Sequence, residues 1–332
     1  MKLLVIRFSS IGDIVLTTPV LRCLKKQLPD VELHYLTKES YRPILEANPY
    51  VDKIITLGLS KTWMLHQLKT EQYDAIIDLH HNLRTWQVKR ALGKIPTYSF
   101  HKLNFQKWLL TTCKINRLPQ THIVDRYLAT VRSLGVVNDG AGLDYFLPEK
   151  HRISPNDIPF SHQMGYIALV IGAAHATKQL TVHRCIELCR RLSFPLILLG
   201  GKEDHARGEQ IAAADPIKVY NACGKFSLHE SADLVQKARV VITPDTGLMH
   251  IAAAFKKPII SIWGNTVPAF GMTPYYGNHH VDHRLSEVSL SCRPCSKIGY
   301  DSCPKKHFKC MENQDLSRIQ SWTDELLAVK VS

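Results

Sequence analysis

The feature that most constrains this fold is an alternation of short apolar runs with amphipathic stretches. In the first half, the expected strands cover residues 3–8, 31–37, 53–57, 73–80 and 95–100, and the expected helices cover residues 19–28, 62–69, 83–92 and 123–135. Strands that alternate with helices form parallel sheets whose faces the helices cover. The first half therefore predicts a doubly wound α/β domain.

The same alternation returns in the second half. Between the halves, residues 137–163 are rich in Asn, Asp, Gly, Pro and His, which indicates a linker. The expected strands then cover residues 166–171, 195–199, 218–220, 239–243 and 258–263, and the expected helices cover residues 182–192, 204–214, 228–238 and 246–255. Residues 312–331 have the apolar spacing of an amphipathic helix.

A chain of 332 residues exceeds what one hydrophobic core usually serves. We therefore expect two Rossmann-like domains facing a cleft, over residues 1–150 and 151–310, with a C-terminal amphipathic helix in residues 311–332. Ligands of such open sheets bind at the carboxyl ends of the strands. The chain has neither G-x-G-x-x-G after its first expected strand nor G-x-x-x-x-G-K-[ST], which argues against a nicotinamide dehydrogenase and a P-loop kinase.

The charge balance favours anionic partners. Lys and Arg number 42 against 29 Asp and Glu, a net charge of +13 that is spread over both halves. Nucleotides, phosphorylated glycolipids, an anionic membrane face or nucleic acid all fit such a balance, and so does a basic surface with no partner. No apolar run approaches the ~20 residues of a membrane-spanning helix, and the N-terminus has the pattern of a strand, so we expect a cytoplasmic protein.

The strongest motif is T-P-D-T-G-L-M-H, which follows an expected strand. Asp245 is expected to be the N-cap of the next helix. The N–H groups of Thr246, Gly247 and Leu248 would then face the cleft as a diphosphate site, and His250 could donate to a phosphate oxygen. A capped helix with a structural Asp and a packed His explains the spacing equally well.

Three other strand ends carry a charged residue. Asp13 ends the loop S-S-I-G-D at the cleft rim, where it could act as a general base or as an N-cap. Lys178, in the loop G-A-A-H-A-T-K, could neutralise a phosphate or be a solvated lysine. Glu203, in G-G-K-E-D, could accept hydrogen bonds from ribose hydroxyls or simply begin a helix.

These motifs together resemble the ADP-heptose:lipopolysaccharide heptosyltransferase family, which is glycosyltransferase family 9, over nearly the whole chain. The resemblance implies a GT-B fold with the acceptor site in the first domain and the donor site in the second. It also implies an ADP-sugar as co-substrate and neither metal nor other cofactor. The implied location is the inner face of the cytoplasmic membrane, with a lipid A/inner-core acceptor and no nucleic acid as partner.

The resemblance also implies roles for individual residues. Asp13 would be the general base, in a loop shaped on the acceptor side by Ser10 and Gly12. The donor phosphates, ribose and sugar would be bound by Lys178, Glu203, Asp245, Thr246, Gly247, Leu248 and His250. The segment D-L-H-H-N-L-R resembles an acceptor-side segment of the family, in which Arg84 could pair with an acidic sugar or phosphate; a helix-start arginine is the alternative.

The implied reaction is one inverting displacement, in which the deprotonated acceptor hydroxyl attacks the anomeric carbon and ADP leaves. One alternative is a transferase of the same fold with another nucleotide-sugar donor. A second is a nucleotide-sugar epimerase or hydrolase without a lipid acceptor. A third is a nucleic-acid-binding protein, which the basic charge suggests but no recognisable binding module supports.

Four cysteines form the pattern C-x2-C-x7-C-x6-C, at Cys292, Cys295, Cys303 and Cys310. Four thiolates suit the tetrahedral preference of zinc. The spacing is looser than that of a zinc ribbon, and reduced thiols that pack a loop are the alternative.

Overall fold

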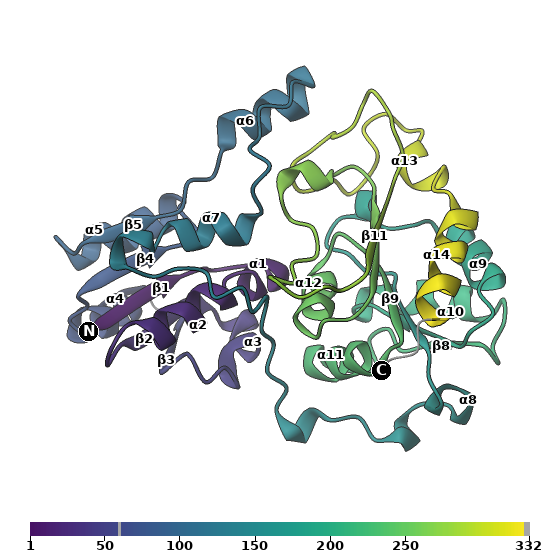
Figure 1. Ribbon diagram of the computed structural model, residues 1–332, viewed down its shortest axis with the longest axis horizontal. Coiled ribbons are helices and arrows are strands. Elements are labelled where there is room, and N and C mark those ends of the chain that lie inside the picture. Colours follow the sequence, from purple (N-terminus) through teal and green to yellow (C-terminus); the bar gives the residue numbers. More distant parts are fainter. Residues whose placement is uncertain (59–60, 329–332) are drawn as a thin grey trace.

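The structure is a computed structural model and describes residues 1–58 and 61–328. Its first half contains one parallel sheet of order β3-β2-β1-β4-β5 (Figure 1). The strands are β1 (Lys2–Ile6), β2 (Glu32–Lys38), β3 (Lys53–Leu57), β4 (Ala75–Asp78) and β5 (Thr97–Ser99). The helices are α1 (Ile11–Val15), α2 (Thr18–Gln27), α3 (Pro43–Glu46), α4 (Lys61–Thr70), α5 (Leu83–Leu92), α6 (Asn104–Trp108) and α7 (Ile123–Ala129), with a π-helical turn at Leu109–Cys113.

The second half contains a parallel sheet of order β11-β10-β9-β6-β7-β8. Its strands are β6 (Ile167–Val170), β7 (Leu196–Leu199), β8 (Val219–Asn221), β9 (Val240–Pro244), β10 (Ile259–Trp263) and β11 (His283–Glu287). Its helices are α8 (Phe160–Gln163), α9 (Val182–Arg191), α10 (His205–Ala212), α11 (Leu228–Lys237), α12 (Gly247–Ala254), α13 (Lys309–Glu312) and α14 (Leu316–Ala328). The two sheets with their helices form the GT-B arrangement that the sequence predicted.

The elements form where the pattern of apolar residues and caps requires them. The central strands β1, β6 and β9 are almost wholly buried, because helices cover both faces of a parallel sheet. Helix α11 begins at a capping box in which Ser227 accepts from the N–H of Glu230 and the Glu230 carboxylate accepts from the N–H of Ser227. Helix α14 packs on α9, β9 and β10, so the C-terminal helix completes the second domain.

Two expectations differ from the structure. The helix expected over residues 123–135 ends at Ala129 and is followed by a 3-10 turn, Arg132–Leu134, because the chain turns at Gly135 with φ of 81°. Strand β11 was not predicted, because its sequence H-R-L-S-E has no apolar alternation and it pairs only at the edge of the sheet. The end of the expected tail helix, residues 329–331, lies outside the described residues.

Ion pairs attach the connecting segment to each half in turn. The buried Arg22 of α2 pairs with Asp139 at 2.7 Å and with Asp144. Further along, Arg152 pairs with Asp233 of α11 at 2.9 Å. The chain therefore passes from the first domain to the second between residues 144 and 152. Within the described residues, every helix is too short or too polar to cross a bilayer.

Candidate active site

The first and last strand-end motifs meet where the two domains touch. Helix α1 packs against α12, and the contact is close at two glycines. A Cβ on Gly12 would lie 2.5 Å from Cδ2 of His250, and one on Gly247 would lie 2.8 Å from Cβ of Ile11. Neither position accepts a side chain without movement, so the contact between the two helices depends on both glycines.

Asp13 lies in this contact with its carboxylate fully engaged. Oδ1 is 2.7 Å from Nη2 of Arg7, and Oδ2 accepts from the hydroxyl of Ser10 at 2.8 Å and from its N–H at 3.2 Å. Burial raises the pKa of Asp13, but the Arg7 guanidinium and the Ser10 hydrogen bonds outweigh it and hold this pKa below its ordinary value. Asp13 is therefore a carboxylate at neutral pH, which is the protonation state of a general base.

Arg7 is a site residue that sequence reasoning missed. It follows β1, is almost completely buried, and donates to the carbonyl of Leu79 at 2.7 Å and to the hydroxyl of Tyr127 at 3.0 Å. These bonds fix the guanidinium against Asp13. A single Arg at the end of a strand that is otherwise apolar was the available signal.

Further basic side chains lie within electrostatic range of Asp13. The negative charge of Asp13 acts to raise the pKa of both Lys102 and Lys107, although burial lowers both overall. Burial, reinforced by Arg126 and Lys297, lowers the pKa of Lys107 to about 8. These cations thus lie close to one another with too little negative charge to balance them, which suits an anionic ligand. Their sequence positions gave no motif, because they come from separate loops and helices.

The D-L-H-H-N-L-R segment forms a tight turn at the end of β4. The buried carboxylate of Asp78 accepts from the N–H groups of His80 and His81, at 3.1 and 2.7 Å, and pairs with Lys89 at 2.8 Å. Arg84 lies exposed in the first turn of α5. The geometry matches the helix-start alternative, and a role for Arg84 in acceptor binding stays a prediction.

His80 is the side chain of this turn that faces the site. Its ring packs on Phe8, with centroids 5.0 Å apart, and its buried Nδ1 has no protein partner. Burial and the neighbouring Arg7 lower its pKa to about 4. His80 is therefore neutral at pH 7 and has a ring nitrogen free for a ligand.

In the second domain, Asp245 is not the N-cap that the sequence predicted. The N-cap of α12 is Thr246, and its side chain makes no capping bond. The carboxylate of Asp245 instead pairs with Nζ of Lys178 at 2.7 Å and accepts from the hydroxyl of Thr266 at 3.0 Å. A partner 67 residues away in the sequence has replaced the local cap.

The first turn of α12 still has the backbone geometry expected of an anion site, and its role in binding a diphosphate stays a prediction. Thr246, Gly247 and Leu248 are half-buried at the carboxyl end of β9, and the first N–H groups of a helix have no partner within it. Lys178 lies beside this turn, because its Nζ also reaches the backbone carbonyl of Asp245 at 3.3 Å. Two predicted parts of a phosphate site are thus in contact.

His250, one turn into α12, is buried and its Nδ1 has no protein partner. Burial lowers its pKa to about 4, although the Asp245 charge opposes this. The ring is therefore neutral at pH 7. It can act by hydrogen bonding, and a dianionic ligand beside it would raise its pKa.

The loops after β7 and β10 lie at the same carboxyl edge of the second sheet as the first turn of α12. Glu203 is exposed after β7, the neighbour of β6 in the sheet, and β6 leads to Lys178. The adjacent Asp204 is buried and accepts from the N–H of Gly201 at 2.9 Å, so it shapes this loop. After β10, the buried Asn265 has both side-chain amide atoms without a protein partner. Asp204 and Asn265 were not singled out from the sequence.

The four clustered cysteines are all free thiols. The thiol of Cys295 donates to the carbonyl of Cys292 at 3.1 Å, and burial raises the pKa of Cys310 to about 11. The part of the chain that the structure describes does not gather three of these thiols within 4.8 Å. The geometry is that of reduced thiols packing a loop, and zinc binding stays a hypothesis.

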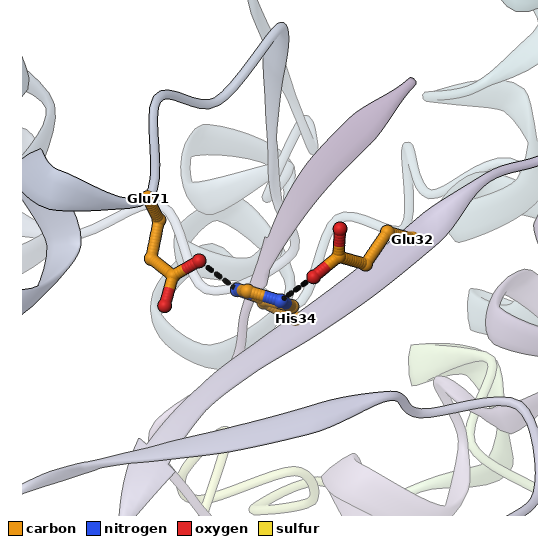
Figure 2. Close-up of side chains that lie close together, drawn as sticks. All are labelled: Glu32, His34 and Glu71. Carbon is orange, nitrogen blue, oxygen red and sulfur yellow. Dashed lines mark hydrogen bonds and ion pairs between the residues drawn. The ribbon is translucent and has the colours of Figure 1, made fainter.

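One group of possible metal ligands does converge, at the opposite edge of the first sheet. Glu32 and Glu71 lie on either side of His34 (Figure 2). Lys2 already pairs with Glu71 at 2.9 Å and with Glu32 at 3.3 Å, and Lys53 also pairs with Glu71. The hydrogen bonds from Lys53 and Lys2 lower the pKa of Glu71 to about 2. Two lysines thus occupy the place of a cation, and the group is a structural ion-pair cluster.

The chain is similar to known proteins over most of its length. The profile of glycosyltransferase family 9 (heptosyltransferase) matches residues 62–302. The lipooligosaccharide heptosyltransferase 2 of Haemophilus influenzae is 26% identical over 315 residues, which cover 87% of this chain and 90% of that protein. The lipopolysaccharide heptosyltransferase 1 of Pseudomonas aeruginosa is 26% identical over 326 residues, covering 90% and 86%.

Solved structures show the same fold. The family 9 glycosyl transferase of Veillonella parvula superposes with a TM-score of 0.78 at 21% identity, covering 98% of this chain and 97% of that one. The ADP-heptose lipopolysaccharide heptosyltransferase II of Escherichia coli superposes with a TM-score of 0.75 at 21% identity, covering both chains completely.

Proposed function

Because this chain belongs to glycosyltransferase family 9, we propose that it transfers a heptose from an ADP-sugar to an inner-core lipopolysaccharide acceptor. The relatives named as lipopolysaccharide or lipooligosaccharide heptosyltransferases support this donor and this acceptor. The observation that carries the proposal is the meeting of an ionised Asp13 with the N-terminus of α12 at the domain contact.

On the acceptor side, Asp13 acts as the general base. Its carboxylate takes the proton from an acceptor hydroxyl as the hydroxyl oxygen bonds to the anomeric carbon. Arg7 and Ser10 hold the carboxylate in place. The basic side chains Lys102 and Lys107 orient an acceptor that carries acidic sugars or phosphates.

On the donor side, the bond from the anomeric carbon to the diphosphate breaks and ADP leaves. The charge that develops on the diphosphate is stabilised by Lys178 and by the N-terminus of α12. His250 donates one hydrogen bond in its neutral form, and Glu203 binds the ribose. Attack from the face opposite the leaving group inverts the anomeric configuration.

Lys178 and the N-terminus of α12 together stabilise the charge on the diphosphate. We therefore propose a reaction that needs no metal. Lys178 and the helix dipole act at the contact between the domains, where the side chains are mostly shielded from water. The enzyme would work at the inner face of the cytoplasmic membrane, where a lipid-linked acceptor is reached from the cytoplasm.

The test is nucleotide release by the purified protein. ADP-heptose is compared with UDP-, GDP- and dTDP-sugars, each with and without a truncated lipopolysaccharide acceptor. We expect ADP release that requires both ADP-heptose and acceptor. Nucleotide release from another donor would show that the enzyme uses a different nucleotide sugar. Release that does not depend on the acceptor would indicate a hydrolase.

A further inference from the structure

One segment of the first domain stands apart from both sheets. Helix α6 and the π-helical turn after it project beyond α7, on the side of the molecule where α13 lies (Figure 1). At the far end of the projection, Nζ of Lys114 donates to the carbonyls of Cys292 and Pro294, at 3.0 and 2.8 Å. The projection is therefore held by the second domain and is not a free loop.

The outer face of this projection is apolar and aromatic. Phe105 is 65% exposed and Trp108 is 52% exposed, and their rings stack with centroids 6.1 Å apart. Ile115 is also exposed, at 49%. Large apolar side chains grouped on a surface mark a binding site, whereas single ones need no explanation. We call Phe105, Trp108 and Ile115 the aromatic tip.

The stretch of chain that contains the aromatic tip carries charge of one sign. Between Asp78 and Asp125 the chain has no acidic residue. The same stretch contains eight basic residues: Arg84, Lys89, Arg90, Lys94, Lys102, Lys107, Lys114 and Arg117. Such a stretch attracts an anionic surface, and aromatic rings with a polar edge settle at the boundary between lipid and water.

The inner face of the same helix belongs to the acceptor side of the site. Lys107 lies between the exposed Phe105 and Trp108 in sequence, but it is half-buried and feels the charges of Asp13 and Arg126. One helix thus presents rings outward and a cation toward the catalytic carboxylate. A sugar attached to a membrane lipid would enter beside the element that contacts the membrane.

We propose that the aromatic tip, with the basic residues of the same stretch of chain, docks this protein onto an anionic lipid bilayer. The proposal rests on the lipid-linked acceptor of the proposed function, and it names the surface that reaches it. Apolar insertion and charge attraction act together here, as stable but reversible membrane attachment requires. A second copy of the chain is the competing occupant.

The test is vesicle flotation of the whole protein with vesicles of phosphatidylcholine alone or mixed equally with phosphatidylglycerol. We expect binding to the mixed vesicles, and loss of it when salt rises from ~0.1 M to 1 M and shortens the Debye length from about 10 to 3 Å. The double variant Phe105→Ser/Trp108→Ser should bind at least tenfold less. Its matched control is Phe160→Ser/Met164→Ser, which removes two residues that are more exposed, at the start and the C-cap of α8, and should bind normally.

Three results would overturn the docking proposal. They are equal binding by both double variants, equal binding to both vesicle types, and a concentration-dependent dimer that is lost in Phe105→Ser/Trp108→Ser. Thermal unfolding shows that each variant is folded. Vesicle binding needs neither donor nor turnover, so its failure is distinct from failure of the proposed function. Binding can be absent while transfer to a water-soluble truncated acceptor persists. Binding can equally be present when no transfer is found.

Discussion

At the scale of residues, the site depends on charges that are set by their neighbours. Asp13 stays ionised although it is half-buried, because Arg7 and Ser10 stabilise the carboxylate. His80 and His250 stay neutral, because burial lowers both pKa values to about 4. The site therefore combines one negative carboxylate with two neutral rings at pH 7. This pattern can be tested by changing the charges one at a time.

The first prediction concerns Arg7→Gln. The pKa of Asp13 is lowered in the folded protein. Wild-type activity should therefore persist as the pH falls to the ordinary carboxyl pKa of about 4, and should be lost only below it. Without the guanidinium, burial dominates and this pKa rises, so the acid limb of kcat/KM should move up by at least one pH unit. The measurement is the pH profile of both proteins.

Arg7→Gln should also lower stability at neutral pH by about 1–3 kcal/mol, because it leaves a half-buried carboxylate without its charged partner. A group with a lowered pKa stabilises the fold above its unfolded pKa and loses that effect as the pH falls. The difference in stability should therefore shrink toward acid pH. An unchanged acid limb in a folded variant would show that Arg7 does not set the protonation of Asp13.

The second prediction concerns Lys178→Met. Removing a charge-assisted contact to the diphosphate should weaken ADP binding roughly tenfold. The matched control is Lys218→Met, which removes a lysine paired with Asp215 at 3.2 Å, next to the amino end of β8. Isothermal titration with ADP gives both affinities. Equal affinities for the two variants would remove Lys178 from the donor site.

At the scale of elements, the structure joins the two domains through the packing of α1 on α12. The contact is made by main chain at Gly12 and Gly247, and it carries Asp13 and His250 on its two sides. A small displacement of either helix would change the distance between base and donor. Catalysis is sensitive to such displacements, since a misplacement of about 1 Å can cost on the order of a hundredfold.

The third prediction concerns Gly12→Ala. The added Cβ would meet the His250 ring at 2.5 Å, so either this ring or one of the two helices must shift. We expect kcat to fall by at least tenfold and stability by about 1–3 kcal/mol, as for other overpacked contacts. The control is Gly58→Ala, where a Cβ would meet nothing within 4 Å. The measurements are steady-state kinetics and thermal unfolding. Equal kcat and equal stability for the two variants would show that the contact at Gly12 does not matter.

Local sequence patterns predicted most elements because parallel strands and their helices carry strong periodicity. The bounds of β3 and α5 agree with the expected ranges, residues 53–57 and 83–92. The pattern failed where a long-range partner decides the structure. Asp245 pairs with Lys178 instead of capping α12, and β11 forms only by pairing with β10.

At the scale of the whole molecule, the candidate site combines parts that are far apart in the sequence. Motifs found the residues at strand ends, because the carboxyl ends of parallel strands share one edge of a sheet. They did not find Arg7, which stands alone at the end of β1, or Lys102 and Lys107, which come from a loop and a helix outside the strand-end motifs. Family 9 membership adds the chemistry to this geometry.

The central claim is that Asp13 is the general base of sugar transfer across the domain contact. The most direct measurement is acceptor-dependent ADP release by Asp13→Asn and Asp13→Ala, together with their affinity for ADP. The account predicts a loss of kcat by a factor of about 10² to 10⁴, with the ADP dissociation constant within about twofold of wild type. Normal release by either folded variant would contradict it.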